Sequence, residues 1–195
     1  MSKQILIDFI QQNIPNIKVA QNAIETISES FEEHPLSKNE YLLKEGKISC
    51  YYYLAEGFLR AFTFDTQGNE ITTSFFEKGR IIFEPTSFFL RLPSVENIQA
   101  ISDCKGYYTT YDKLNILFHS TPEFREFARA MLAKEFITYK SHTLAMINKS
   151  AEQRYLELMQ NNKELFQHAQ LKHIASYLGM TDTSLSRVRR EFSKK

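Results

Sequence analysis

The chain has 195 residues, 43% of them hydrophobic, with sixteen phenylalanines and a formal net charge of only +1. That length fits one large domain or one medium and one small domain, and the apolar content suffices for a core without disulfides or metals. No run of about 18 apolar residues occurs, which excludes a membrane span, and residues 1–14 carry too short an apolar run for a signal peptide, so we expect a cytoplasmic protein.

Residues 1–33 carry apolar side chains at helical spacing, with an expected break at Asn13-Ile14-Pro15-Asn16. The predicted inward face of the first helix is Ile5, Leu6, Phe9 and Ile10. A second helix is predicted from about residue 19 to residue 30, with its buried face at Ala23, Ile24 and Ile27.

From residue 34 the pattern changes to short strands between regular turns. Gly46, Gly57, Gly68 and Gly79 follow one another at intervals of eleven residues, and the segments between them are rich in Tyr, Phe, Ile and Thr. Strands are predicted at residues 51–55, 58–64, 70–76, 95–101 and 104–109, with a hairpin loop at residues 65–69. Such turn spacing is typical of a β-sandwich or barrel, so we predict a closed or double-sheet roll of about eight strands over residues 34–110.

Helical spacing returns at residue 111, first in a short helix over residues 111–118. Thr121 and Pro122 then provide an N-cap and a proline at the first helical position, and no Pro or Gly follows before about Asn148. This long helix carries a broad apolar stripe at Phe124, Phe127, Ala128, Met131, Ala133, Phe136, Ile137, Leu144 and Ile147. A helix of this length cannot bury both sides in a small domain, which favours pairing with a second copy of the chain; packing on its own roll alone is the alternative.

The last segment, residues 170–195, contains two short helical patterns on either side of Gly179. Gly179 supplies the positive φ that ends one helix, and Thr181 or Asp182 can cap the next. The second helix has an apolar face with Leu185, Val188 and Phe192, and a polar face with Thr183, Ser186, Arg187 and Arg190. From residue 172 onward, six Lys or Arg and two Asp or Glu give a local net charge of +4. A turn followed by a polar, cationic helix is the layout of a helix-turn-helix, whose second helix reads DNA; a helical hairpin with a solvated basic face is the alternative.

The order of these segments resembles the Crp/Fnr family of bacterial transcription regulators over nearly the whole chain. Its strongest motif is IASYLGMTDTSLSRVRREF at residues 174–192, and YLLKEGKISCYYYLAEGFLRAF at 41–62 and AEQRYLELM at 151–159 add to it. The variant is most like regulators common in Bacteroidetes. The resemblance implies an α+β chain with a double-stranded β-helix (jelly-roll, cyclic nucleotide-binding-like) domain over residues 1–120, a long dimerisation helix over 121–149 and a helix-turn-helix domain over 150–195.

The resemblance also implies a sequence-specific transcription regulator that binds double-stranded DNA as a homodimer on a near-palindromic operator, with RNA polymerase as a further partner. By position in the motif, Asp182, Thr183 and Arg187 fall where family members touch base edges, and Arg187 is the best candidate because its guanidinium can bind a guanine with two hydrogen bonds. For Asp182 we favour capping of the helix over base contact. The remaining expected DNA contacts, mostly to phosphates, are Thr181, Ser184, Ser186, Arg189, Arg190 and the terminal lysines. An effector in the roll is expected to shift the long helices and so reposition the two recognition helices.

Family members that bind cyclic AMP hold it in a cassette within the roll, where a Gly-Glu-Leu turn and a later Arg grip the ribose and the phosphate. In the corresponding stretch Phe83 replaces the glycine, Pro85 removes a backbone donor, and Arg91 lies a few residues before the phosphate position. We therefore expect no tight cyclic AMP binding, no cofactor, and either another small effector or none. The expected polar lining of an effector pocket is Glu84, Thr86, Ser87, Arg91 and Asn97. Glu84 can instead be a surface or capping carboxylate.

Two other functional classes are alternatives for a chain with this order of segments. An enzyme on a cupin-type roll needs a His-x-His pair and a Glu for its metal, but residues 34–110 contain only His34, so we predict no catalytic residue, no metal site and no enzyme. The second alternative is a cyclic nucleotide-binding sensor whose C-terminal helices bind a protein partner rather than DNA. Salt dependence separates it from a DNA-binding protein, because contacts to phosphates weaken steeply with salt.

The remaining predictions concern single residue types and one missing element. Cys50 and Cys104 are too few for an iron–sulfur cluster or a Cys-rich zinc site, and we interpret them as buried or semi-buried inert thiols, with a redox pair as the alternative. The five histidines lie mostly at predicted helix ends or on polar faces, where we expect them to be solvated. The family usually has a small β-wing in its DNA-binding domain, but residues 165–169 are too short for the expected hairpin.

Overall fold

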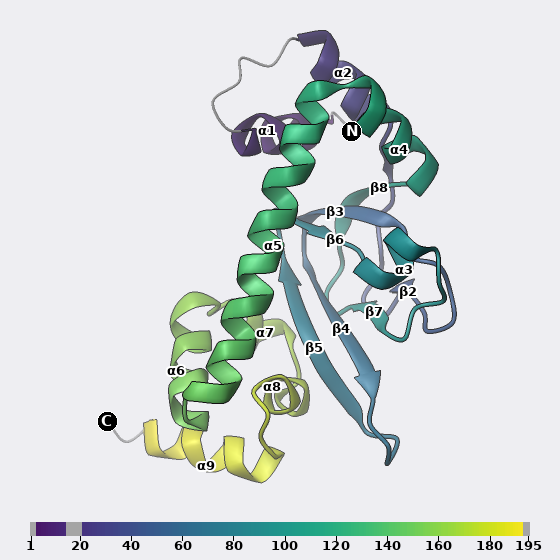
Figure 1. Cartoon of the computed structure of the whole chain (residues 1–195). Helices are drawn as coiled ribbons and strands as arrows, with labels where there is room; N and C mark the ends of the chain where they lie inside the picture. Colours follow the sequence, from purple (N-terminus) through teal and green to yellow (C-terminus); the bar gives the residue numbers. More distant parts are fainter. Residues whose placement is uncertain (1–2, 15–20, 193–195) are drawn as a thin grey trace.

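The computed structural model describes residues 3–14 and 21–192. One long helix, α5, runs the length of the molecule, with the N-terminal helices at one end, the β-roll along one side and the C-terminal helices at the other end (Figure 1). The helices are α1 (Gln4–Asn13), α2 (Gln21–Glu29), α3 (Pro85–Leu90), α4 (Tyr111–Ser120), α5 (Pro122–Asn148), α6 (Ala151–Asn161), α7 (Leu165–His168), α8 (Leu171–Tyr177) and α9 (Asp182–Phe192). The strands are β1 (Glu32–Glu33), β2 (Tyr41–Leu43), β3 (Tyr51–Glu56), β4 (Phe58–Phe64), β5 (Glu70–Glu77), β6 (Arg80–Ile82), β7 (Asn97–Ala100) and β8 (Lys105–Thr109). The predicted α+β order of roll, long helix and C-terminal helices is confirmed.

The roll consists of two antiparallel four-stranded sheets, with strand orders β1-β8-β3-β6 and β2-β7-β4-β5. Alternate side chains of the two sheets meet between them in a buried core: Leu43, Tyr52, Leu54, Leu59, Ala61, Phe76, Ile82 and Ile98. The loop of the long β4–β5 hairpin is held by the Asp65 carboxylate, which accepts hydrogen bonds from the backbone N–H groups of Gln67 (2.8 Å) and Asn69 (2.9 Å). The predicted roll and its hairpin loop are thus confirmed, and the short strands β1, β2 and β6 are additional to the five that the sequence located.

The outer face of the sheet β1-β8-β3-β6 is covered by α1, α2, α4 and the first half of α5. The second core lies there and contains Leu6, Phe9, Ile10, Ile27, Phe31, Tyr51, Tyr53, Phe83, Phe88, Leu114, Phe124 and Phe127, among others. Ala23, Ile24 and Ile27 of α2 are buried as predicted. The prediction for Ile5 is wrong: its side chain is 46% exposed, because it lies about 100° round the helix from Leu6 while Phe9 and Ile10 share the inward face. The predicted break after α1 lies largely outside the described residues.

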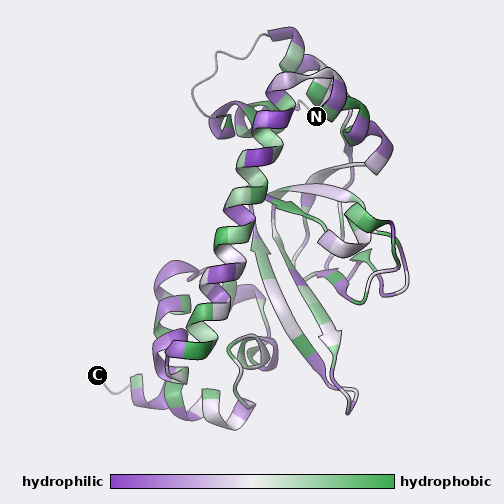
Figure 2. Cartoon of the chain, in the orientation of Figure 1, coloured by the Kyte–Doolittle hydropathy of each residue, from purple (hydrophilic) through white to green (hydrophobic). Residues whose placement is uncertain are grey.

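Helix α5 begins at Pro122 and ends at Asn148, as predicted. Thr121 occupies its N-cap position, although the Thr121 hydroxyl makes no capping hydrogen bond. Arg80 of β6 joins this helix to the roll, since its guanidinium donates to both carboxylate oxygens of Glu135, at 3.0 and 2.6 Å. Hydrophobic residues recur along the whole helix (Figure 2), but from Leu132 onward these are exposed: Leu132, Phe136, Ile137, Tyr139, Leu144, Met146 and Ile147. Packing on its own roll therefore leaves an uncovered apolar face on α5.

The C-terminal helices pack around a third core that also includes side chains of the roll. Its members from the C-terminal helices are Tyr155, Leu165, Ala169, Ile174, Ala175, Leu178, Leu185 and Val188. Phe58 of β4 and Ile101 complete this core, and His168 stacks on Phe58 with 4.5 Å between ring centroids. Where a β-wing is expected, the chain forms the single-turn helix α7, and residues 150–192 contain no strand. No helix in the described part of the chain is both long and apolar enough to cross a membrane.

Candidate nucleic-acid interface and effector site

The turn between α8 and α9 is built on Gly179, whose φ is +64°. Two backbone hydrogen bonds of 3.0 Å close it, from the Gly179 N–H to the Ser176 carbonyl and from the Met180 N–H to the Ala175 carbonyl. This pair of bonds is the Schellman arrangement, which requires a left-handed residue at the position after the helix end. A Cβ atom at Gly179 would lie 2.4 Å from the terminal methyl of Met146, so the turn also packs closely against the end of α5.

The N-terminus of α9 is capped by Thr181. Its hydroxyl oxygen accepts a hydrogen bond from the Ser184 N–H at 3.2 Å and lies 3.0 Å from the Ser184 hydroxyl. The expectation that Asp182 caps the helix is therefore wrong, because Asp182 is already the first helical residue. Its exposed carboxylate instead lies in the first turn, where negative charge stabilises the helix dipole.

Helix α9 directs its apolar side into the third core and its polar side to solvent. Leu185 and Val188 are buried. The predicted DNA-contact residues lie on this one helix and its cap, and all are exposed except the half-buried Ser184: Thr181, Asp182, Thr183, Ser184, Ser186, Arg187, Arg189 and Arg190. Among the described residues Arg187 and Arg190 form no ion pair, so the face carries uncompensated positive charge. The terminal lysines lie outside the described residues.

Arg154 of α6 holds the α8–α9 turn in place, a role that the sequence interpretation missed. Its Nε donates to the Leu178 carbonyl at 2.9 Å, and its Nη1 donates to the Lys149 carbonyl at 2.7 Å. One residue thus ties the end of α5 to the end of α8. Helix α6 is itself fixed by a capping box between Ser150 and Gln153, and this S-x-x-Q signal was available in the sequence.

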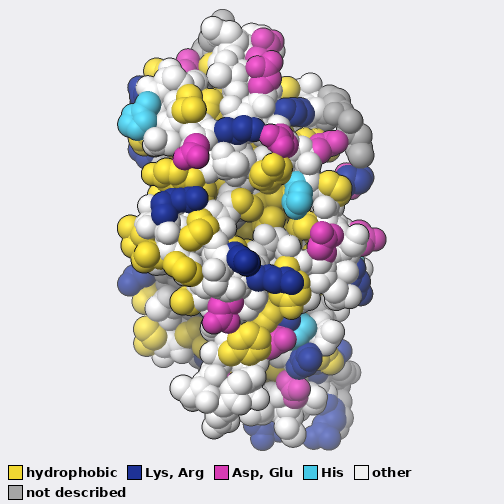
Figure 3. Space-filling model, turned by 90° about the vertical axis from the view of Figure 1, so that its right-hand side faces the viewer, with side chains coloured by type: hydrophobic (Ala, Val, Ile, Leu, Met, Phe, Trp, Pro, Cys, Tyr) yellow, Lys and Arg dark blue, Asp and Glu magenta, His cyan; other side chains and the backbone are white. Residues whose placement is uncertain are grey.

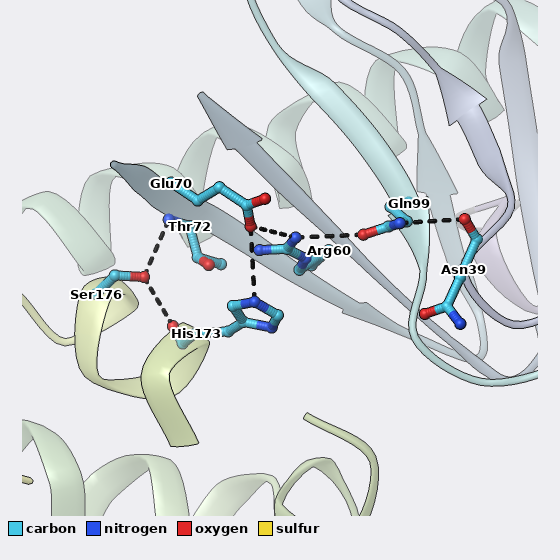
Figure 4. Close-up of polar contacts among 7 residues, drawn as sticks. All are labelled: Asn39, Arg60, Glu70, Thr72, Gln99, His173 and Ser176. Carbon is cyan, nitrogen blue, oxygen red and sulfur yellow. Dashed lines mark hydrogen bonds and ion pairs between the residues drawn. The ribbon is translucent and has the colours of Figure 1, made fainter. Parts of the chain in front are cut away.

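A buried polar junction joins α8 to the β4–β5 hairpin (Figure 4). The Arg60 guanidinium is only 3% exposed; its Nη2 lies 2.5 Å from a Glu70 carboxylate oxygen and 3.2 Å from the Gln99 side-chain oxygen. The same Glu70 oxygen lies 3.6 Å from Nε2 of His173 on α8. Beside this cluster, the Thr72 backbone N–H of β5 donates to the Ser176 hydroxyl of α8 at 3.1 Å. Helix α8 therefore covers the outer edge of β5 and gives one of its backbone donors a partner.

His173 is buried, contrary to the expectation that the histidines are solvated. Burial, together with the charges of Arg60 and Lys172, lowers the pKa of His173 to about 4. The imidazole is therefore neutral at pH 7, and its approach to Glu70 is not an ion pair at that pH. His142 of α5 is half-buried and stacks on Tyr177 of α8 with 4.4 Å between centroids, and burial also lowers the pKa of His142.

Three of the five residues predicted to line an effector pocket, Glu84, Ser87 and Asn97, make hydrogen bonds to backbone groups of the roll. The Glu84 carboxylate caps α3 by accepting hydrogen bonds from the N–H groups of Thr86 (3.0 Å) and Ser87 (2.6 Å), which is the capping alternative. The Ser87 hydroxyl accepts from the Ser49 N–H, and the Asn97 side-chain oxygen accepts from the Glu45 N–H. Thr86 and Arg91 are exposed. The polar atoms of this segment thus hold the cassette loop together.

Two of the cavities between α5 and the rest of the described chain lie against the roll and the N-terminal half of α5, and none of those five residues lines either. The smaller, about 190 Å³, is lined by Phe76, Ile81, Phe83, Pro85, Leu132, Glu135, Phe136 and Tyr139. The larger, about 260 Å³, lies between α3, α4 and α5. Both have mostly apolar walls. The cysteines lie elsewhere and are unpaired; burial raises the pKa of Cys50 to about 11 and also raises that of Cys104, so both are protonated, unreactive thiols at neutral pH.

The chain is similar to known proteins in two ways, through a sequence match of its roll to a family and through the likeness of its fold to solved structures. Residues 33–121, which span the roll, match the cyclic nucleotide-binding domain family. Solved structures with a similar fold include a protein from Eubacterium rectale assigned to the Crp/Fnr family of transcriptional regulators, with a TM-score of 0.71, 14% identity, and coverage of 90% of this chain and 84% of that one. FixK2 from Bradyrhizobium japonicum has a TM-score of 0.70, 18% identity, and coverage of 84% and 85%.

A third similar structure is CLP from Xanthomonas campestris, described as a c-di-GMP-responsive global regulator, with a TM-score of 0.70, 15% identity, and coverage of 90% of this chain and 92% of that one. No curated protein sequence matches the chain. At these identities the structural likeness establishes the fold, while the sequence match establishes the family of the roll. The roll therefore belongs to the cyclic nucleotide-binding domain family, and the whole chain has the fold of Crp/Fnr-family transcription regulators.

Proposed function

We propose that the chain is a sequence-specific DNA-binding transcription regulator of the Crp/Fnr type. The observation that carries the proposal is the division of α9 into a face buried in the third core and an exposed face with Thr183, Ser186, Arg187 and Arg190. A helix held by its apolar side and presenting Arg, Ser and Thr outward can enter the major groove, which is about 12 Å wide. Residues 150–195 then form the DNA-binding domain, residues 121–149 the dimerisation helix and residues 1–120 the sensor domain.

The side chains of the exposed face divide by chemistry into base and phosphate contacts. Arg187, in the second turn of α9, is the proposed base reader, because a guanidinium can donate to O6 and N7 of one guanine. Thr183 and Asp182 lie one turn earlier, toward the same groove. Phosphate contacts are assigned to the cap and to the last turn, where Arg190 lies, and these set the position of the protein on the duplex without reading sequence.

The exposed second half of α5 supports a homodimer. Its residues Ala133, Ile137, Lys140, Leu144 and Ile147 are all exposed and are spaced alternately by four and three, which is the seam of a two-stranded coiled coil. We call these five residues the α5 seam. Ile137 and Ile147 are 64% and 76% exposed, so a parallel second copy would bury surface that is otherwise left in water. A two-fold dimer would present two α9 helices to half-sites about 34 Å apart.

The regulator would be controlled by a small effector other than cyclic AMP. The support is the cassette itself, where the Glu84 carboxylate is occupied in capping α3 and Pro85 has no N–H to offer a phosphate. Without an Arg at the phosphate position, the nucleotide lacks its strongest charge-assisted partner.

Selection of binding sites from random duplexes tests the proposal, using the wild type, Arg187→Ala and the control Arg129→Ala. Arg129 is an exposed arginine on α5, far from α9, so this variant changes the net charge equally. The wild type and the control should select the same near-palindrome, with half-site centres about 10 base pairs apart. Arg187→Ala should relax one position in each half-site and lose about 1–3 kcal/mol of discrimination there.

The outcomes separate the competing functions. An unchanged selected sequence in Arg187→Ala would exclude Arg187 as the base reader. If the folded wild type enriches no sequence, and its retention on DNA does not fall between low and moderate salt, DNA binding is wrong and the protein-partner alternative is favoured.

The dimer is tested by sedimentation of the wild type, Ile137→Asp and the control Thr138→Asp, an exposed position off the α5 seam. In the Ile137→Asp dimer two buried isoleucines are lost and two charges are buried, which weakens dimer formation by roughly 3 kcal/mol or more. The dissociation constant of this dimer should therefore be at least about 100-fold higher than that of the wild type. Thr138→Asp should behave as the wild type. A wild type that is monomeric at micromolar concentration would contradict the dimer.

A further inference from the structure

The larger cavity, between α3, α4 and α5, has the form of a small ligand site. Its volume is about 260 Å³. Its lining residues are Tyr51, Phe88, Phe89, Tyr111, Leu114, Asn115, Phe118, His119, Phe124, Ala128 and Leu132. The interior wall is apolar and well packed, since Tyr51, Phe88, Leu114 and Phe124 are all buried. The polar groups, from Asn115 and His119, are exposed at the mouth.

The rim of this cavity leaves large apolar side chains in water. Phe89, Phe118 and Leu132 are 48%, 44% and 43% exposed. On the face of the molecule that carries α3 and α4, hydrophobic side chains gather at mid-height with Lys and Arg side chains among them (Figure 3). An apolar molecule in the cavity would cover these three side chains, and the gain from removing apolar surface from water would favour its binding.

Beside the cavity, although not among its lining residues, lies a cation that has no carboxylate partner among the described residues. Arg91, the residue that ends α3, has a φ of +57°, and its guanidinium lies 4.9 Å above the ring of Tyr111, which lines the cavity. Arg60, Arg80 and Arg129 each pair with a carboxylate, but among the described residues Arg91 forms no ion pair. The charge is thus held over an aromatic ring at the cavity wall and remains available to an anion.

We propose that this cavity binds a small carboxylic acid with an aromatic or medium-length acyl body. The apolar body would lie among the aromatic side chains, and the carboxylate would pair with Arg91 at the mouth. A volume of about 260 Å³ suits a molecule smaller than most drug-sized ligands, for which pockets of roughly 300–1,000 Å³ are usual. The proposal concerns binding alone and does not depend on DNA recognition; if the proposed function holds, the acid is a candidate effector, because Ala128 and Leu132 belong to α5.

A second copy of the chain is the competing occupant, and the geometry disfavours it. The cavity is walled chiefly by α4, and its three α5 residues, Phe124, Ala128 and Leu132, are not in the α5 seam. A partner helix lying along the seam would leave the cavity mouth open. A small acid also accounts for Arg91, whereas an apolar partner surface would leave that charge without a counterpart.

Calorimetric titration of the full-length chain with 2-naphthoate and octanoate tests the proposal, with 2-naphthol and octanol as neutral analogues. The wild type should bind each acid saturably. Arg91→Asn removes the charge while keeping a residue that tolerates positive φ. It should lower the affinity for the acids about fivefold but leave the affinity for the alcohols unchanged. Asn115→Trp, at the exposed mouth, should block acids and alcohols alike without altering the core, and Ala128→Phe should do the same by filling the cavity.

Four results would overturn the proposal. One is absence of saturable binding of either acid at millimolar concentration by the folded wild type. Another is binding that neither Asn115→Trp nor Ala128→Phe reduces, which would place the acid elsewhere. The third is an equal loss of acid and alcohol binding in Arg91→Asn, which would mean that Arg91 does not recognise the carboxylate. Acid binding that dissociates a wild-type dimer would assign the cavity to the second copy instead. Because no DNA is present, failure of DNA recognition leaves these outcomes unchanged.

Discussion

Neutralising Glu70 probes the buried junction between the β4–β5 hairpin and α8. The Arg60 guanidinium is 3% exposed and has Glu70 as its counter-charge at 2.5 Å, while its Nε and Nη1 have no hydrogen-bond partner among the described residues. Glu70→Gln therefore leaves a buried cation without a compensating charge. Removing one partner of a fully buried pair costs about 3–5 kcal/mol, but Glu70 is 36% exposed and water screens part of the effect, so we expect a loss of about 2 kcal/mol. For a chain of this size the melting temperature should fall by about 4–8 °C.

Arg60→Met supplies the contrast that makes the argument testable. In the native protein the Arg60 guanidinium lies 4.0 Å from the centre of the Phe62 ring. Arg60→Met removes the charge and keeps an unbranched side chain over this ring, so the free energy of unfolding should fall by less than about 1 kcal/mol. In the Arg60→Met background, Glu70→Gln should then cost less than about 0.5 kcal/mol. Urea unfolding of the four proteins gives the double-mutant cycle, and hydrogen exchange in α8 locates the effect. Equal and additive losses from the two single substitutions would refute the reasoning.

Three further substitutions or conditions test other parts of the structure. The pKa of His173 is about 4 in the folded chain and about 6.5 in the unfolded chain, so between these values the unfolded chain binds the extra proton. The free energy of unfolding should therefore be highest above pH 6.5 and fall between pH 6.5 and 4, by roughly 1–2 kcal/mol at pH 5. The fall should be smaller in His173→Gln, and a urea midpoint independent of pH in this window would contradict the argument. Gly179→Ala should lower the free energy of unfolding by about 1–2 kcal/mol, because a left-handed residue gains a Cβ and the Met146 methyl must move. Gly179→Asn should have less backbone strain, because Asn tolerates the left-handed conformation. Equal thermal stability of Gly179→Ala and the wild type would exclude the left-handed turn. Arg154→Met should lower the free energy of unfolding by about 1–3 kcal/mol, because it leaves the Leu178 carbonyl without its side-chain donor. It should also weaken operator binding more than Arg129→Ala, a control at an exposed arginine of α5; unchanged DNA affinity would separate Arg154 from positioning of the turn.

Elements with local sequence signals were predicted closely. Helix α5 has the predicted bounds, because a proline fixes its first turn and no helix breaker follows before its end. The β4–β5 hairpin could be located because its strands and its loop, with Asp65, Gly68 and Asn69, are contiguous in sequence. The two helices around Gly179 follow from the positive φ that glycine adopts readily.

Features that depend on distant contacts were not predicted. His173 was interpreted as solvated because its place in a short helix gives no sign of the hairpin that covers it, and its closest charged neighbours, Arg60 and Glu70, are more than a hundred positions away. The cassette residues could serve equally as ligand contacts or as loop hydrogen bonds; only the three-dimensional positions of the Glu84 carboxylate and the Ser87 hydroxyl decide for the second. Sequence could not reveal that Arg91 lies over Tyr111 either, because the left-handed conformation at the end of α3 directs it there.

The third core takes Phe58 and Ile101 from the roll, and this makes the two ends of the chain thermodynamically interdependent. A fragment containing only residues 150–195 would lose these two side chains and expose the apolar surfaces that they cover, so it should be less stable than the same helices in the full chain. The coupling is reciprocal. If the docked roll stabilises one arrangement of α8 and α9, a partner that binds this arrangement stabilises the docked roll by the same free energy. DNA bound at α9 would then change the thermal stability of the roll that contains β4, although no nucleotide contacts that strand.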